Sequence, residues 1–214
     1  MPARLAILAS GRGSNLQAIL DAIAAGRLDA RIAGVFSDKP DAQALQRVPE
    51  PLRWSRTPKS CGGRDAFDAV LADAVAACEP DWIVCVGYMR ILGEAFVQRF
   101  AGKILNIHPS LLPKHKGLHT HQRALDDGDA EHGASLHFVD TELDGGAVIA
   151  QARVPVLPTD DADTLAARVL AVEHPLLLEV LQLAASGRLA ERDGHATVDG
   201  QALFTPLSLE SMAT

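Results

Sequence analysis

The chain has 214 residues, of which 48% are hydrophobic and 22% charged, which is typical of a globular protein with one substantial core, in one domain or at most two. A formal net charge of -7 argues against nucleic-acid binding as the main activity, because such binding relies on clustered lysine and arginine. The three cysteines form no Cys-x-x-Cys pair, so we expect no disulfide framework and no zinc knuckle. No apolar segment is long enough for a signal peptide or a membrane span, so we expect no membrane contact and a cytoplasmic location.

A glycine-containing loop follows the first predicted strand. Residues 3–9 form an apolar run typical of a buried parallel strand, and Ser10-Gly11-Arg12-Gly13-Ser14-Asn15 leads into a predicted helix over residues 16–25. The glycines allow close backbone approach, Ser14 or Asn15 can cap the helix, and the free N–H groups of its first turn attract an anion. We therefore predict a phosphate site, with a glycine turn that binds nothing as the alternative, because the dinucleotide and P-loop fingerprints are both incomplete.

Predicted strands and helices alternate along the first half of the chain. This alternation indicates a mostly parallel sheet of the Rossmann-like α/β class, with helices on both faces. In such sheets ligands bind beyond the carboxyl ends of the strands, where the glycine loop and residues 88–92 are expected to lie. The further strands are predicted at residues 31–37, 52–54, 81–87 and 104–108, and the further helices at residues 41–47 and 65–78.

The predicted strand over residues 104–108 carries two polar residues near its end. Successive side chains of a strand alternate between its faces, so Leu105 and Ile107 should point into the core while Asn106 and His108 share the other face. Pro109 ends the strand. A hydrogen-bond donor beside a titratable base suits acyl transfer, in which an oxyanion develops, although a buried structural histidine is the simpler interpretation of His108 alone.

The segment from Lys114 to His121 is basic and rich in turn residues, and a short helix is predicted over residues 120–127. Its three histidines, His115, His119 and His121, raise the possibility of a metal site. No carboxylate or cysteine at a spacing typical of zinc accompanies them, so we predict no metal and favour a mobile loop or a phosphate contact.

Two strands in hairpin relation are predicted next, over residues 133–139 and 148–156, so the sheet should become antiparallel in this part. The acidic turn between them carries Asp144, whose carboxylate could reach His108. Acidic residues in loops are more often simply solvated, so both interpretations stay open.

A long amphipathic helix is predicted from Asp161 onward. Pro175 should kink this helix or start a second one, just after Glu173. Beyond Gly187 we expect only a short strand and an irregular ending.

Several motifs, in one order along nearly the whole chain, resemble the phosphoribosylglycinamide formyltransferase family. The resemblance implies a single formyltransferase domain over residues 1–214, with a nucleotide-binding or phosphate-binding half at 1–100 and a catalytic, folate-binding half at 101–214. The motifs are Ser10-Gly11-Arg12-Gly13-Ser14-Asn15-Leu16-Gln17-Ala18, Gly87-Tyr88-Met89-Arg90-Ile91-Leu92, Asn106-Ile107-His108-Pro109-Ser110-Leu111-Leu112-Pro113, Gly117-Leu118-His119-Thr120-His121, Gly133-Ala134-Ser135-Leu136-His137-Phe138-Val139 and Leu143-Asp144-Gly145-Gly146.

The activity that the resemblance implies is transfer of a formyl group from 10-formyltetrahydrofolate to the amine of glycinamide ribonucleotide in purine biosynthesis. It implies no tightly bound cofactor, no metal, no nucleic acid or membrane partner, small-molecule substrates only, and a monomer or homodimer. The implied catalytic residues are Asn106, His108 and Asp144, the residues for the ribonucleotide are Gly13, Ser14, Asn15 and Glu173, and those for folate are Arg64, Met89, Arg90, Ile91, Leu92, Asn106, Asp140, Thr141, Glu142, Leu143 and Asp144.

Three other functions remain as alternatives. A formyltetrahydrofolate deformylase shares the catalytic trio but transfers the formyl group to water, and it carries an additional N-terminal domain. A methionyl-tRNA formyltransferase needs an RNA-binding domain and a basic surface, which this acidic chain lacks. A nucleotide-binding module without catalysis would explain the glycine loop, but it would leave Asn106, His108 and Asp144 without a role.

Overall fold

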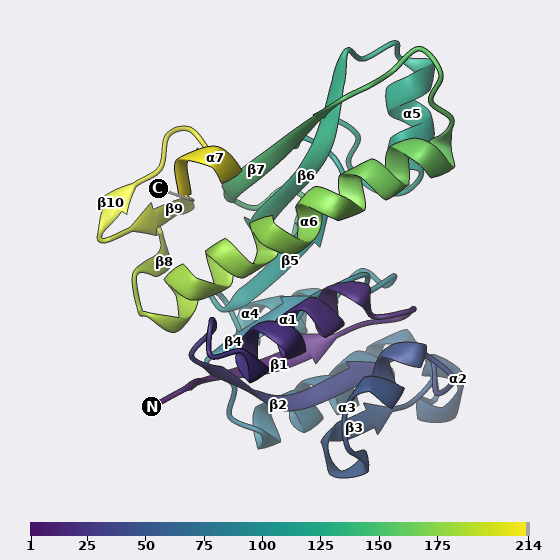
Figure 1. The fold of residues 1–214 in the computed structure, drawn as a ribbon. Helices are drawn as coiled ribbons and strands as arrows, with labels where there is room; N and C mark the ends of the chain where they lie inside the picture. Colours follow the sequence, from purple (N-terminus) through teal and green to yellow (C-terminus); the bar gives the residue numbers. More distant parts are fainter. Residues whose placement is uncertain (213–214) are drawn as a thin grey trace. The chain divides into compact units, whose positions relative to one another are not determined.

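The computed structural model describes residues 1–212, which fall into two compact units (Figure 1). The first unit is Met1–Asn106 and the second begins at Ile107. Strand β5 (Ile104–His108) contributes residues to both units. In the part of the chain described here, no helix combines the length and the apolar character needed to cross a membrane.

The first unit contains a parallel sheet in the order β5-β4-β1-β2-β3. Its central strand is apolar on both faces, and the side chains of Leu5 and Ile7 are at most 1% exposed. Such continuous burial is typical of a parallel strand that is covered by helices on both sides, as the sequence predicted. The strands other than β5 are β1 (Ala3–Leu8), β2 (Ala30–Ser37), β3 (Arg53–Ser55) and β4 (Trp82–Cys85).

Helices lie on both faces of this sheet. Figure 1 shows α1 in front of β1, with α3 and α4 behind the strands. The predicted helix over 41–47 is a 3-10 helix instead, η1, because the backbone N–H of Ala44 bonds to the carbonyl of Gly11 and the short segment ends before Pro49. The helical segments are α1 (Ser14–Ala24), η1 (Gln43–Arg47), η2 (Glu50–Leu52), α2 (Pro58–Cys61), α3 (Arg64–Ala77) and α4 (Glu94–Arg99).

The predicted cap of α1 is wrong. Gly13 is the N-cap residue, with φ of 75°, so the helix starts at Ser14, two residues earlier than expected. Ser14 and Asn15 therefore belong to the first turn, and among the described residues no side chain caps this helix. Glycine in the left-handed conformation can itself turn the chain into a helix, so no capping side chain is needed here.

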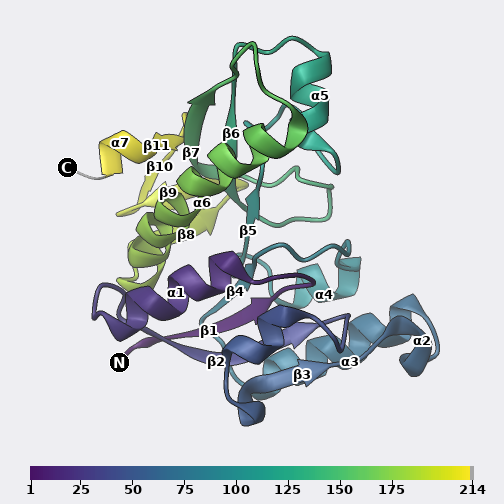
Figure 2. The same cartoon turned by 45° about the vertical axis from the view of Figure 1, so that its right-hand side comes forward.

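The second unit contains the predicted antiparallel hairpin of β6 (Glu131–Phe138) and β7 (Val148–Pro155). Strand β11 pairs with β7 in parallel. Helix α6 packs against both hairpin strands, as Figures 1 and 2 show from two directions. The unit also contains α5 (Thr120–Asp126), α6 (Ala162–Ala185), β11 (Leu207–Ser208) and α7 (Leu209–Met212).

Helix α6 is one uninterrupted helix of 24 residues with Pro175 inside it. The alternative of a second helix starting there is therefore wrong. Proline removes one helical hydrogen bond, but Leu176, Leu177 and Val180 beyond it are fully buried, and burial of such side chains stabilises a helix by about 1.5–3 kcal/mol each. Asp161 and Thr164 form a capping box at its start.

The chain after α6 holds more structure than predicted. A three-stranded antiparallel sheet in the order β10-β9-β8 replaces the expected short strand and irregular ending. Its turns are Asp193-Gly194 and Asp199-Gly200, and all four residues have positive φ, as two-residue hairpin turns require. The strands are β8 (Leu189–Arg192), β9 (His195–Val198) and β10 (Gln201–Ala202).

Candidate active site

The predicted phosphate loop is built around a glycine that no other residue can replace without strain. Gly13 has φ of 75°, and a Cβ atom there would lie 2.8 Å from the Cα and Cβ atoms of Ala44. Arg47 brings a cation to the same loop, because its Nε donates to the carbonyl of Arg12 at 2.9 Å and its Nη1 to Gln17 at 2.8 Å. A cation beside the positive end of the α1 dipole favours an anionic ligand.

Ser10 ties together the carboxyl ends of three parallel strands. Its backbone N–H donates to the carbonyl of Gly87 at 3.1 Å, and its hydroxyl donates to Asp38 at 2.6 Å. The same hydroxyl accepts from the backbone N–H of Met89 at 3.0 Å. The glycine loop after β1 and the segment after β4 therefore meet at one edge of the first unit, as expected for a ligand-binding edge of a parallel sheet.

The segment 88–92, predicted to contact folate, presents apolar side chains to solvent. Met89 is 63% exposed and Ile91 is 55% exposed, so this apolar stretch is not simply core. Arg64 donates to the carbonyl of Ile91 at 3.2 Å, and the guanidinium of Arg90 lies 5.2 Å from the centre of the Phe67 ring. Adjacent exposed apolar side chains backed by cations are what a flat ligand with an acidic tail would bind.

Asn106 and His108 lie two positions apart on β5. Side chains two positions apart on a strand leave the same face, which is the arrangement expected for this pair. Asn106 is partly exposed, whereas His108 is only 6% exposed. His108 is therefore held in place by its surroundings.

Both ring nitrogens of His108 face oxygen atoms. Nε2 lies 3.0 Å from the backbone carbonyl oxygen of His115, and Nδ1 lies 3.5 Å from Oδ2 of Asp144. A carbonyl and a carboxylate can only accept hydrogen bonds, so this arrangement suits an imidazole that carries a proton on each nitrogen. The positive charge of such a ring can stabilise a nearby oxyanion, and an N–H that turns from its present oxygen partner to a ligand can donate a proton.

Asp144 is held in an uncommon backbone conformation. It has φ of 47°, and its Oδ2 accepts a hydrogen bond of 2.8 Å from the backbone N–H of Gly117. Its other oxygen lies 3.7 Å from Nε2 of His137, whose Nδ1 bonds to the carbonyl of Phe138 at 2.7 Å. Burial lowers the pKa of His137, which keeps this second ring neutral. The charge of Asp144 is therefore available to His108.

Three further histidines, His115, His121 and His132, lie near His108 in the second unit. Nε2 of His115 is 2.7 Å from Oδ2 of Asp129, and Nδ1 of His121 is 3.2 Å from Nε2 of His132. Burial is the main cause that lowers the pKa of His132, to about 4, and burial also lowers the pKa of His121. Within residues 1–212, no three histidine, cysteine or acidic side chains are grouped as a metal site requires.

The buried His132 should make folding sensitive to acid. Its pKa is about 4 in the folded chain and ~6.5 when unfolded, so the unfolded chain binds more protons below neutral pH. The stability that neutral His132 provides is therefore complete above about pH 6.5 and is lost as the pH falls toward 4. We expect the free energy of unfolding to fall by about 1–3 kcal/mol more in the native protein than in His132→Phe between about pH 7 and pH 4.5.

Denaturant unfolding at the two pH values measures this difference. His195→Ala, which removes an exposed histidine, is the matched control and should keep the pH dependence of the native protein. Equal losses of stability in the native protein and in His132→Phe would contradict the prediction.

The remaining predicted residues lie in two places in the second unit. Glu173 is on α6 and is 9% exposed, so its carboxylate is largely buried. The loop 140–144 is exposed apart from Asp144: Glu142 pairs with Lys116 at 2.7 Å, and Leu143 is 46% exposed. The loop thus offers apolar and charged groups to a ligand.

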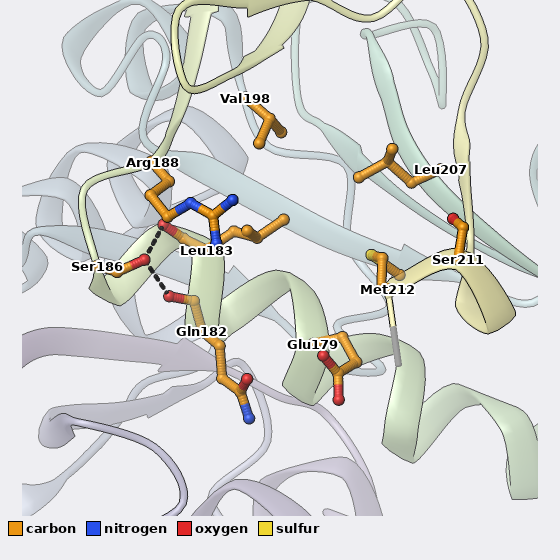
Figure 3. A pocket seen from close by; sticks show the side chains of 9 residues that line it. All are labelled: Glu179, Gln182, Leu183, Ser186, Arg188, Val198, Leu207, Ser211 and Met212. Atoms are coloured by element: carbon orange, nitrogen blue, oxygen red, sulfur yellow. Dashed lines mark hydrogen bonds between the residues drawn. The ribbon is translucent and has the colours of Figure 1, made fainter. Parts of the chain in front are cut away.

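A cavity of about 560 Å³ lies elsewhere in the second unit, between the C-terminal part of α6 and the chain that follows it (Figure 3). Glu179, Arg188 and Met212 are among its lining residues, and these differ from all residues predicted for the site. Arg188 is already paired with Asp199 at 2.7 Å. We assign the cavity no role in the site.

The groups that hold these side chains in place are not evident from the sequence. Ser10 bonds to Asp38 across 28 positions, and His115 bonds to Asp129 across 14. The Gly117 N–H that fixes Asp144 is a backbone group, which no side-chain motif indicates. Only Asp129 had a local signal, since it follows the predicted helix and Gly128 directly.

Comparison with known proteins gives consistent matches. The model of the formyl transferase family matches residues 3–181. A phosphoribosylglycinamide formyltransferase of Escherichia coli is 46% identical over 201 residues, which cover 93% of this chain and 95% of that protein. The structure of a phosphoribosylglycinamide formyltransferase from Coxiella burnetii is 40% identical with a TM-score of 0.90 and covers 97% of this chain and 99% of that one. A formyltetrahydrofolate deformylase from Pseudomonas syringae pv. tomato is 27% identical with a TM-score of 0.82, over 92% of this chain and 66% of that one.

Proposed function

The chain belongs to the formyl transferase family, and from this premise we propose that it transfers the formyl group of 10-formyltetrahydrofolate to the amine of 5-phosphoribosylglycinamide. The products are the formylglycinamide ribonucleotide and tetrahydrofolate, in de novo purine biosynthesis. The observation that carries the proposal is the buried ring of His108, held between the carbonyl of His115 and the carboxylate of Asp144. The names of the relatives with high coverage support the choice of substrates.

In the proposed reaction the amine attacks the formyl carbon and an oxyanion forms. The amide of Asn106 stabilises this oxyanion by a hydrogen bond, and the protonated ring of His108 stabilises it by its positive charge. The tetrahedral intermediate then breaks its bond to the folate nitrogen, to which His108 helps pass a proton, while the attacking nitrogen loses one. Asp144, 3.5 Å from Nδ1, stabilises the positive charge of His108 throughout.

The binding roles follow the same proposal. Gly13, Ser14 and Asn15 bind the phosphate of the ribonucleotide through the start of α1, and Glu173 contacts the ribonucleotide beyond it. The folate binds Arg64, the 89–92 segment, Asn106 and the loop 140–144. We propose that the chain acts as one domain on these small molecules, as a cytoplasmic monomer or homodimer with no tightly bound cofactor.

Deformylase activity is the second candidate, because a formyltetrahydrofolate deformylase has a similar structure. It would use the same oxyanion stabilisation and the same histidine. Only the nucleophile differs, since water replaces the amine. The two functions therefore differ in whether formyl loss requires the ribonucleotide.

A spectrophotometric assay with 10-formyl-5,8-dideazafolate tests both candidates. We expect formyl loss to require glycinamide ribonucleotide and to be absent with ribose 5-phosphate, which carries a phosphate but no amine. Equal formyl loss without the ribonucleotide would show a deformylase. No reaction under either condition would contradict catalysis of this kind altogether.

A further inference from the structure

We propose that His115 and Asp129 are a positioning pair for His108 and act through the backbone carbonyl of His115. The inference rests on the proposed function, because it gives the pair a role in the same site. Neither side chain needs to touch a substrate for this role. The pair orients the ring of His108, which does contact the substrate in the proposed reaction.

One ring nitrogen of His108 contacts the backbone of His115. Nε2 of His108 lies 3.0 Å from the carbonyl oxygen of His115, and the ring is buried. This hydrogen bond determines which ring nitrogen turns toward Asp144. Any movement of the carbonyl would rotate or release the ring, and small displacements of reacting groups reduce rates strongly.

The backbone of His115 has an uncommon conformation. Its φ is 54°, in the left-handed region, which costs a residue other than glycine about 1–2 kcal/mol. The carbonyl points at His108 only while this conformation is maintained. Something must therefore hold the residue in it, and the side chain of His115 is only 4% exposed.

The side chain of His115 is held by Asp129. Nε2 of His115 lies 2.7 Å from Oδ2 of Asp129, and Oδ1 of the same carboxylate accepts from Lys114 at 2.6 Å. Asp129 is anchored by its backbone N–H, which donates to Ala124 in α5 at 3.0 Å. Hydrogen bonds from His115 and Lys114 lower the pKa of Asp129, so it stays charged. Asp127 also faces His115, but at 3.8 Å and with 66% of its side chain exposed.

The test uses Asp129→Asn and His115→Phe, with Asp127→Asn as the matched control. We expect both pair variants to lower kcat about tenfold and to leave the KM of each substrate within about twofold. Asp127→Asn should change neither constant, because its carboxylate lies 3.8 Å from Nδ1 of His115, beyond hydrogen-bond distance, and is mostly solvated. Asp129→Glu should recover part of the lost kcat, since it restores the charge.

A double-mutant cycle shows whether the pair acts through His108. In the His108→Ala background, Asp129→Asn should have no further effect on kcat, because the ring that it positions is gone. An equal additional fall in that background would overturn the proposal, as would an unchanged kcat in Asp129→Asn with a folded protein. If His115→Phe fails to fold, the isosteric Asp129→Asn decides alone.

The ring nitrogens of His108 provide a readout that does not depend on turnover. In ¹⁵N NMR spectra we expect the Nε2 signal of His108 to shift in Asp129→Asn and to stay unchanged in Asp127→Asn. If the native protein lacked transferase activity but the shift occurred, the proposed function would fail and the positioning would stand. If neither kcat nor the Nε2 signal responded to Asp129→Asn, the positioning proposal alone would be wrong.

Discussion

Replacing His108 with alanine should lower kcat by on the order of 10² or more, the range expected when an acid–base group and an oxyanion donor are lost together. The ring faces the carbonyl of His115 and the carboxylate of Asp144, and both contacts disappear with it. The KM values should change little, since neither proposed binding segment is altered. Steady-state kinetics with 10-formyl-5,8-dideazafolate and the ribonucleotide give both constants.

The control for this variant is His195→Ala, which removes an exposed imidazole on β9 and should keep native kinetics. Circular dichroism and thermal unfolding would show that His108→Ala remains folded. Asn106→Ala tests the other oxyanion donor under the same conditions. Near-native turnover in His108→Ala, Asn106→Ala and Asp144→Ala together would show that the mechanism is wrong even though the family is right.

The change Asp144→Asn should also lower kcat by on the order of 10², because the asparagine keeps the shape of the side chain but removes its charge. The carboxylate lies 3.5 Å from Nδ1 of His108 and accepts from the N–H of Gly117 at 2.8 Å. The amide oxygen of asparagine can still accept from Gly117, so the loop should keep its conformation. Asparagine also tolerates the φ of 47° found here. The loss therefore reports on electrostatic stabilisation of the imidazolium.

Asp163→Asn is the matched control for this second variant, since it neutralises a carboxylate in the first turn of α6 that has no part in the proposed site. Its kcat should equal that of the native protein. Asp144→Ala should be at least as slow as Asp144→Asn. A native rate in Asp144→Asn would show that the charge is not needed, and Asp144 would then keep only a structural role.

Local sequence patterns were sufficient for the parallel sheet and for the antiparallel hairpin. The apolar run around Leu5 and Ile7 and the strand–helix alternation predicted the parallel sheet, and the 133–139 and 148–156 segments predicted the hairpin. The small sheet after α6 could have been predicted too, because Asp-Gly pairs at 193–194 and 199–200 are strong hairpin signals. Pro175 did not end the helix, because burial on α6 outweighs the hydrogen bond that proline removes.

The site could be predicted only where one strand or one loop carries it. Asn106 and His108 share a face because they are two residues apart on β5, which alternation predicts directly. Two other contacts join residues whose spacing along the chain does not match the repeat of a helix or a strand. They are His115 with Asp129 and Ser10 with Asp38. Such contacts are decided by tertiary packing, so no spacing rule indicates them.

The hydroxyl of Ser10 also fixes a direction. It has one proton, which goes to Asp38, and its lone pair receives the N–H of Met89, which can only donate. Three loops from distant parts of the sequence thus share a single hydrogen-bond arrangement, and none of its parts depends on a ligand. The backbone at Met89 is therefore fixed at the edge of the sheet, so a ligand that binds beside the exposed side chains of Met89 and Ile91 spends little affinity on ordering that backbone.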